Sequence, residues 1–170
     1  MSELRFWLWL ASREGVRARS KLLLLEQLGD VQEVYFARDG DYKRLGFLTE
    51  AELASLGQKS LNDSMRIMDA CADGDIGIVT LRDAAYPRRL RETYAPPLAL
   101  YVRGRLPNID ELCAVAVVGT RSATPYGLKM AQQMGYGICK CGGMVVSGLT
   151  RGVDAAAAHG AVMANGRCVG

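Results

Sequence analysis

The chain has 170 residues, of which 49% are hydrophobic and 23% are charged, with 21 Lys and Arg against 18 Asp and Glu. This composition is typical of a soluble globular protein, and no apolar stretch approaches the roughly 18 residues of a membrane span. Five scattered cysteines favour reduced thiols, and the N-terminus lacks a secretion signal, so we expect a cytoplasmic protein.

The net charge of +3 is concentrated in the C-terminal part of the chain. Residues 1–110 contain 16 basic and 16 acidic residues, whereas residues 111–170 contain five basic and two acidic ones. This distribution permits a polyanionic partner for the C-terminal part but does not require one.

Residues 1–75 are predicted to form a module of short helices joined by tight turns. The best-signalled helix begins at the N-cap residue Thr49, continues with early acidic residues, and ends at Gly57. The predicted helices are Ser2–Leu10, Arg13–Leu28, Val31–Arg38 (closed by Asp39-Gly40), Thr49–Gly57 and Ser60–Ala72. A compact helical module of this kind suits protein docking or loose DNA contact.

The second predicted helix carries a basic face formed by Arg13, Arg17, Arg19 and Lys21. Two roles are open for it, contact with DNA or simple exposure to solvent. Because a charged helix face is usually solvated surface, we favour the second.

A change of composition at Asp73-Gly-Asp75 places a domain boundary at residue 75. The stretch that follows is predicted to hold two strands, Ile76–Leu81 and Leu98–Arg103, with a short turn-helix at Tyr86–Leu90 between them. A turn-rich linker then covers Gly104–Asp110.

From Cys113 onward strands and helices alternate, which predicts an α/β fold with a parallel sheet and right-handed crossovers, the first part of a Rossmann-like domain. The predicted elements are a buried interior strand at Val115–Val118, a helix at Pro125–Cys141 capped by Thr124, a strand at Met144–Val146, a helix at Val153–Ala164 and a strand at Arg167–Val169. On the first of these helices, Leu128, Met134 and Ile138 are expected on the buried side. Three strands leave apolar faces uncovered, so we expect the chain to be part of a longer protein.

Two glycine-containing turns follow the first two strands of this region. They contain the candidate binding residues Gly119, Thr120 and Arg121 in the first turn, and Ser147, Gly148 and Arg151 in the second. Ligands of open α/β sheets bind beyond the carboxyl ends of the strands, where helix N-termini and arginines favour phosphate. The turns therefore predict an anion site, although the glycines could instead serve only tight strand-to-helix packing.

Other kinds of site find little support. The first turn is not G-x-G-x-x-G and no Walker A loop occurs, so no nucleotide cofactor is expected. Ser147 does not lie in a G-x-S-x-G elbow, and His159 has no ligand or catalytic partners at suitable spacing, so neither a metal site nor catalysis is expected. We expect Asp154 to cap its helix or orient the turn, and His159 to make a local hydrogen bond.

Several motifs occur together in the second half of the chain. They are Tyr86-Pro-x-x-Leu90, Pro96-Pro97-x-x-Leu100-Tyr101-x-x-Gly104, Val117-Val-Gly-Thr-Arg121 with Tyr126-Gly127, and Val145-Val-Ser-Gly-Leu-Thr-Arg-Gly-Val-Asp154 through Ala158-His159-Gly160-Ala161. In this order and spacing, residues 86–170 resemble the bacterial DNA-processing protein A family, DprA or Smf.

This resemblance implies a cytoplasmic, non-enzymatic protein of natural transformation. Such a protein binds single-stranded DNA in a basic pocket of an extended Rossmann fold, protects it, helps to load the RecA recombinase, and acts as a homodimer. The resemblance further implies a sterile-alpha-motif-like module at residues 1–75 and a DNA-binding domain from residue 76.

Residue by residue, Arg121 matches the arginine of the family's G-[ST]-R turn, and Arg151 matches the basic residue of its S-G-L-A-[KR]-G-[IV]-D turn. Thr150 stands where alanine is usual. The family's later Y-P-x-x-N and R-N-R segments are expected beyond Gly170, which would truncate the chain within the Rossmann-like domain.

Two alternatives stay open. The first is a nucleotide-processing enzyme of the lysine-decarboxylase-like Rossmann group, which would need an acidic pair, whereas residues 111–170 offer only Glu111 and Asp154. The second is a protein whose helical module serves chiefly for docking to a partner protein.

Overall fold

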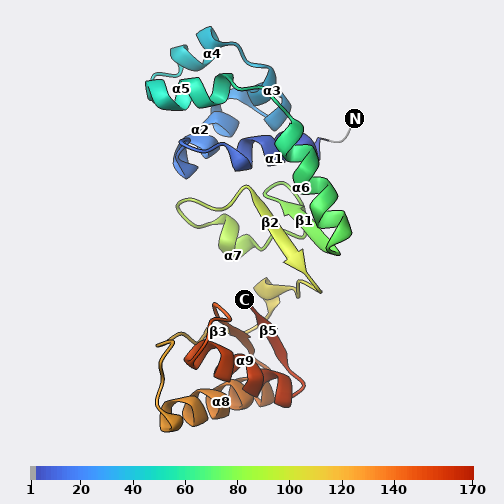
Figure 1. Cartoon of the computed structure of the whole chain (residues 1–170), viewed down its shortest axis with the longest axis vertical. Coiled ribbons are helices and arrows are strands. Elements are labelled where there is room, and N and C mark those ends of the chain that lie inside the picture. Colours follow the sequence, from blue (N-terminus) through green and yellow to red (C-terminus); the bar gives the residue numbers. More distant parts are fainter. Residues whose placement is uncertain (1–2) are drawn as a thin grey trace. The chain divides into compact units, whose positions relative to one another are not determined.

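The computed structural model describes residues 3–170, which fall into two compact units. The first unit ends at Arg105 and the second runs from Leu106 to Gly170 (Figure 1). The helix cap predicted at Ser2 lies outside the described residues.

Among the described residues, no helix combines the length and the apolar character needed to cross a membrane.

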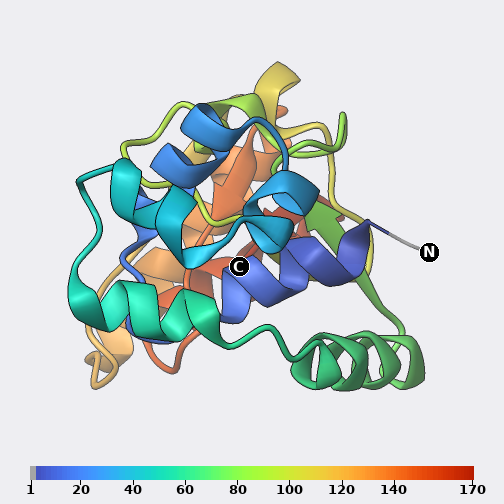
Figure 2. The ribbon, with the colours of Figure 1, turned by 90° about the horizontal axis from the view of Figure 1, so that it is seen from above.

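Helices dominate the first unit, and their apolar faces meet in one core. They are α1 (Leu4–Ser12), α2 (Ala18–Leu28), α3 (Val31–Phe36), α4 (Asp39–Arg44), α5 (Glu50–Gly57) and α6 (Asn62–Asp73). At the centre, Trp9, Leu10, Leu24, Tyr42 and Leu56 are fully buried. Figure 2 shows α5 and α6 following each other along one side of this unit, with the loop of residues 58–61 between them.

The second predicted helix begins later than expected. Instead of starting at Arg13, α2 starts at Ala18, because Gly15 adopts a positive φ of 77° and Arg17 is extended. The backbone amide of Arg17 donates to Oε1 of Glu52 at 3.1 Å, and this bond holds residue 17 outside the helix.

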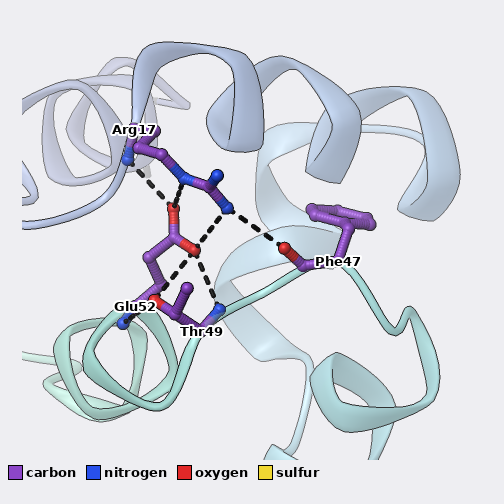
Figure 3. Close-up of polar contacts among 4 residues, drawn as sticks. All are labelled: Arg17, Phe47, Thr49 and Glu52. Atoms are coloured by element: carbon purple, nitrogen blue, oxygen red, sulfur yellow. Dashed lines mark hydrogen bonds and ion pairs between the residues drawn. The ribbon is translucent and has the colours of Figure 1, made fainter.

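Glu52 joins the entry of α2 to the start of α5 (Figure 3). Its side chain is 1% exposed, and it accepts bonds from Nε and Nη2 of Arg17, each at 3.0 Å, and from the amide of Thr49 at 2.9 Å. Nη2 of Arg17 also donates to the carbonyl of Phe47 at 3.1 Å. Burial by itself would raise the pKa of Glu52, but the hydrogen bonds from Arg17, Thr49 and Ser20 outweigh it and hold that pKa well below its usual range.

Several basic residues before and within α2 make hydrogen bonds inside their own unit. Besides the contacts of Arg17, Nη1 of Arg13 donates to the carbonyl of Gln58 at 3.1 Å. Nζ of Lys21 donates to the carbonyl of Ala11 at 2.6 Å. The side chains of Arg17 and Arg19 remain 62% and 43% exposed, so this face lies at the surface while its cations also bond to groups of the same unit.

The predicted end of a helix at Asp39-Gly40 was also wrong, because these residues begin α4. The amide of Arg38 donates to Oδ2 of Asp41 at 3.1 Å, which closes the first turn. Two acidic residues in the first turn and two basic residues in the last complement the helix dipole and support this short helix.

Strands β1 (Ile76–Thr80) and β2 (Ala99–Arg103) pair as an antiparallel sheet within the first unit, and α7 (Arg88–Arg91) lies between them in the chain. Leu98 and Leu81 pack into the helical core. The hydroxyl of Tyr86 donates to the carbonyl of Pro97 at 2.8 Å. This bond joins the segment just before α7 to the segment just before β2. These contacts extend the first unit to Arg105.

The second unit is a small parallel sheet with two helices, so the chain as a whole has a mixed α/β fold. After the short 3-10 helix η1 (Ile109–Glu111) come β3 (Ala114–Ala116), α8 (Pro125–Lys140), β4 (Met144–Val146), α9 (Val153–Met163) and β5 (Arg167–Val169). The strands are parallel in the order β3-β4-β5, and α8 and α9 pack against each other and against β4.

Small residues set the distance between α8 and α9. A Cβ atom on Gly135 would lie 2.0 Å from the carbonyl oxygen of Ala157, and one on Gly160 would lie 2.0 Å from that of Gln132. The two helix backbones are therefore in direct contact at both positions, where only glycine fits.

Two expectations for this unit were wrong. Ala131 and Gly135 form the buried side of α8, whereas Leu128 and Met134 are exposed, because α9 approaches too closely for large side chains. The first strand is also shorter than predicted and lies at an edge of the sheet, with Val118 72% exposed.

Candidate functional site

The two predicted turns begin at the same edge of the parallel sheet. Strands β3 and β4 are adjacent and parallel, so residues 119–122 and 147–152 both follow carboxyl ends. Beyond each turn a helix begins, α8 at Pro125 and α9 at Val153. As predicted, Thr124 is the N-cap of α8, and its hydroxyl accepts from the amide of Gly127 at 3.1 Å.

The first turn is fixed through its backbone. The amide of Gly119 donates to Oδ1 of Asp154 at 3.1 Å, and the carbonyl of Thr120 accepts from the amide of Val153 at 3.2 Å. Both partners belong to the first turn of α9. Gly119 and Thr120 are exposed to solvent, although their backbone groups are bonded to the first turn of α9.

The second turn begins with a buried residue and continues with exposed ones. Ser147 is 5% exposed, and its amide donates to the carbonyl of Val169 at 2.9 Å. Its buried hydroxyl oxygen has no hydrogen-bond partner among the described residues. Leu149 adopts a positive φ of 50°, an uncommon conformation for a non-glycine residue, within the turn that leads into α9.

Asp154 links the two turns. It is 6% exposed, and while Oδ1 accepts from Gly119, Oδ2 accepts from the hydroxyl of Thr150 at 2.9 Å. A Cβ atom on Gly148 would lie 3.0 Å from the same Oδ2, so the second turn passes close over the carboxylate. Of the two roles expected for Asp154, the structure shows the orientation of the turn.

Gly152 brings the backbones of the two turns together, a role that motif matching by itself did not indicate. Its φ is 93°, and an added Cβ would lie 2.1 Å from the carbonyl oxygen of Thr120 and 2.8 Å from the Cα of Arg121. The sequence signal for this role was a glycine placed directly before Val153-Asp154, where the helix begins.

Arg121 and Arg151 consequently project from adjoining stretches of backbone. Both are exposed, and neither guanidinium makes an ion pair or hydrogen bond with any of residues 3–170. An arginine in this state offers its full fork of N–H donors to an external anion. Of the six candidate binding residues, these two are the cations that the fold leaves available.

The geometry also limits what this site offers. The amide of Gly119, expected to face an anion, is already used by Asp154, whose negative charge lies beneath the turns. Anion binding would therefore depend on the two arginines and on the exposed amides of residues such as Arg121 and Gly148, which have no acceptor among the described residues.

His159 does not make the local hydrogen bond that was expected. It is exposed on α9 and has no hydrogen-bond partner within residues 3–170. In that same part of the chain, no group of three or more His, Cys, Asp or Glu side chains is placed to hold a metal ion.

Comparisons with known proteins agree with the second half of the chain in particular. Residues 77–170 match the family described as DNA recombination-mediator protein A. The DNA processing protein DprA of Bacillus subtilis (strain 168) is 30% identical over 105 residues, covering 62% of this chain and 35% of that protein. Protein Smf of Synechocystis sp. is 27% identical over 174 residues, covering 99% of this chain and 43% of that protein.

The fold agrees over a longer stretch. The X-ray structure of DprA from Streptococcus pneumoniae superimposes with a TM-score of 0.71 at 24% identity, covering 99% of this chain and 57% of that one. The chain thus spans 35% and 43% of the length of the Bacillus and Synechocystis relatives. Because the family match extends over more than half of its residues, the chain belongs to the DNA recombination-mediator protein A family.

Proposed function

We propose that this protein binds single-stranded DNA by its phosphate backbone, with Arg121 and Arg151 as the principal contacts. The family supports this proposal, since its description is recombination mediation. The observation that carries it is the pair of unpaired arginines on two turns that Asp154 and Gly152 hold together. Gly119, Thr120, Ser147 and Gly148 would shape the backbone that a phosphate approaches.

The chemistry favours a polymer over a small nucleotide. The arginines lie on exposed turns, where successive phosphates of an extended strand can reach both cations. Single-stranded DNA is commonly held in this way, by a charged track that follows its backbone. A nucleotide-processing enzyme would need an acidic pair, and the geometry gives it no support. Both carboxylate oxygens of Asp154 already accept hydrogen bonds, and Glu111 belongs to η1, which precedes β3, whereas the two turns follow β3 and β4.

In the complete protein, we propose that this sheet forms the first part of a Rossmann-like DNA-binding domain and that residues 1–75 form a sterile-alpha-motif-like module. The protein would act in the cytoplasm during natural transformation, without enzymatic activity or a cofactor. It would protect incoming DNA as a homodimer and assist the loading of a RecA-type recombinase.

The DNA-binding proposal is tested by fluorescence anisotropy with a labelled oligothymidine and the full chain. Arg121→Ala and Arg151→Ala should each weaken binding by about ten-fold, because each removes a charged phosphate contact. Each should also reduce the slope of log K against log salt by about 0.7.

Lys140→Ala is the matched control, since it removes one positive charge from the opposite end of α8 and should leave binding within about two-fold. Unchanged affinity and salt slope in both arginine variants, with wild-type circular dichroism, would refute the proposed contacts.

A further inference from the structure

Lys59 lies in the loop between α5 and α6, and its ammonium group is enclosed by aromatic rings. Nζ lies 4.7 Å from the ring centroids of both Trp9 and Tyr42, and 5.4 Å from that of Tyr35. It also donates to the hydroxyl of Tyr42 at 2.6 Å, and that hydroxyl in turn donates to the carbonyl of Val34. Three helices thus place this amine in a defined position.

The backbone that carries Lys59 is equally fixed. The hydroxyl of Tyr35 donates to the carbonyl of Lys59 at 2.5 Å, and Nε1 of Trp9 donates to the carbonyl of Gln58 at 2.9 Å. The amine therefore has little freedom to withdraw into solvent.

Lys59 also lines an open surface cavity of about 650 Å³. The same cavity is lined by the exposed Phe36 and by Arg38, whose guanidinium makes no ion pair or hydrogen bond with any of residues 3–170. Lys59 and an arginine with an unpaired guanidinium thus line one cavity, and the guanidinium can bind a phosphate group.

Burial lowers the pKa of Lys59, the nearby Asp39 opposes this effect and Arg13 adds to it, and together they bring the pKa to about 8. The phenols of Tyr35 and Tyr42 also face the ammonium group. A lysine of this kind is neutral in roughly a quarter of molecules at pH 7.5, against about 0.1% for an ordinary lysine.

From this arrangement we propose that Lys59 is an acylation site and that the cavity accepts small acyl phosphates such as acetyl phosphate. The phosphate would pair with Arg38 while the lone pair of the neutral Nζ attacks the carbonyl carbon. The bond from that carbon to the phosphate oxygen breaks, inorganic phosphate leaves with the electron pair, and the nitrogen loses a proton to solvent. The product is an uncharged amide, which can no longer make the cation–π contacts with the three rings.

The test treats the full chain with acetyl phosphate at pH 7.5 and follows each lysine by peptide mass spectrometry. Lys59 should be acetylated roughly ten-fold faster than the exposed Lys43, with a rate that rises with pH and is half-maximal near pH 8. Lys21 is the sharper comparison, because burial also lowers its pKa but it is bound to the Ala11 carbonyl and does not line the cavity.

Acetylation of Lys59 no faster than that of Lys43 or Lys21 would overturn the proposal. Arg38→Ala should slow the reaction of Lys59 with acetyl phosphate about three-fold and leave its reaction with acetic anhydride unchanged. Equal rates of wild type and Arg38→Ala with acetyl phosphate would overturn the role of the cavity in phosphate binding. Lys59→Arg, which keeps the charge but cannot form the amide, confirms the peptide assignment.

Discussion

The two compact units are built by opposite means. In the first, large side chains such as Trp9 and Tyr42 fill the core, and cations such as Arg17 and Lys21 are bound to carboxylates or carbonyls of the same unit. In the second, Gly135 and Gly160 bring two helix backbones into contact, and both arginines of the turns remain unpaired. Arg17 and Lys21 thus stabilise the first unit itself, whereas Arg121 and Arg151 of the second unit remain available to an external partner.

This contrast can be measured because both tryptophans of the chain, Trp7 and Trp9, lie in α1 of the first unit. Tryptophan fluorescence therefore reports the first unit, while far-ultraviolet circular dichroism reports both. Three substitutions use this difference, from the largest expected effect to the smallest.

Gly160→Val should have the largest effect. A Cβ at this position would lie 2.0 Å from the Gln132 carbonyl oxygen, so α8 and α9 would have to separate. We expect a loss of at least about 3 kcal/mol in the second unit, seen as an early circular dichroism transition while the tryptophan transition stays in place.

The control is Gly137→Ala in the neighbouring helix α8, where nothing lies within 4 Å of an added Cβ. Its higher helix propensity should leave stability unchanged or raise it by up to about 1 kcal/mol. Equal stability of the two variants would show that the close helix approach is not required.

Glu52→Gln should act on the first unit instead. It removes the charge that accepts bonds from Arg17 and Thr49 inside a buried site, and we expect a loss of about 2 kcal/mol in the tryptophan-detected transition. Glu50→Gln, at an exposed position of the same helix, should change stability by less than about 0.5 kcal/mol.

The same residue gives the first unit a pH dependence. Because the folded state lowers the pKa of Glu52 below its ordinary value of 4.5, its contribution is complete above that pH and is lost progressively as the pH falls below it. Denaturation at a series of pH values should therefore show a steeper acid loss in wild type than in Glu52→Gln; parallel curves would assign the loss to other carboxylates.

Thr150→Ala should have the smallest effect. It removes the hydroxyl bond to Oδ2 of Asp154 and should cost the second unit about 1 kcal/mol in the circular dichroism transition. Thr120→Ala, which removes only an exposed bond to the amide of Ser122, should cost less than half as much. A larger loss from Thr120→Ala would argue against Asp154 as the link between the turns.

Local signals were sufficient for most elements. The cap at Thr49, the Thr124-Pro125 start of α8 and the alternation of strands and helices after Cys113 all appear in the structure. These features depend on neighbours in the chain, which a sequence shows directly.

The errors came from contacts between distant residues. The start of α2 depends on Glu52, 35 residues beyond Arg17, and the buried side of α8 depends on how closely α9 approaches. In the site, the turns were found from their glycines and arginines, but the use of the Gly119 amide by Asp154 required the fold. Hydrophobic periodicity favoured Leu128 and Met134 because it gives no weight to glycine.

Under the proposed function, the carboxylate of Asp154 would also couple ligand binding to folding. The turns that it joins follow different strands, so a strand of DNA bound to both arginines would bridge the same two segments from the solvent side. Such a ligand binds only when both turns are in place, and at 100 times its dissociation constant it would stabilise the second unit by about 2.7 kcal/mol. Occupancy of the site would then appear as resistance of residues 106–170 to proteolysis.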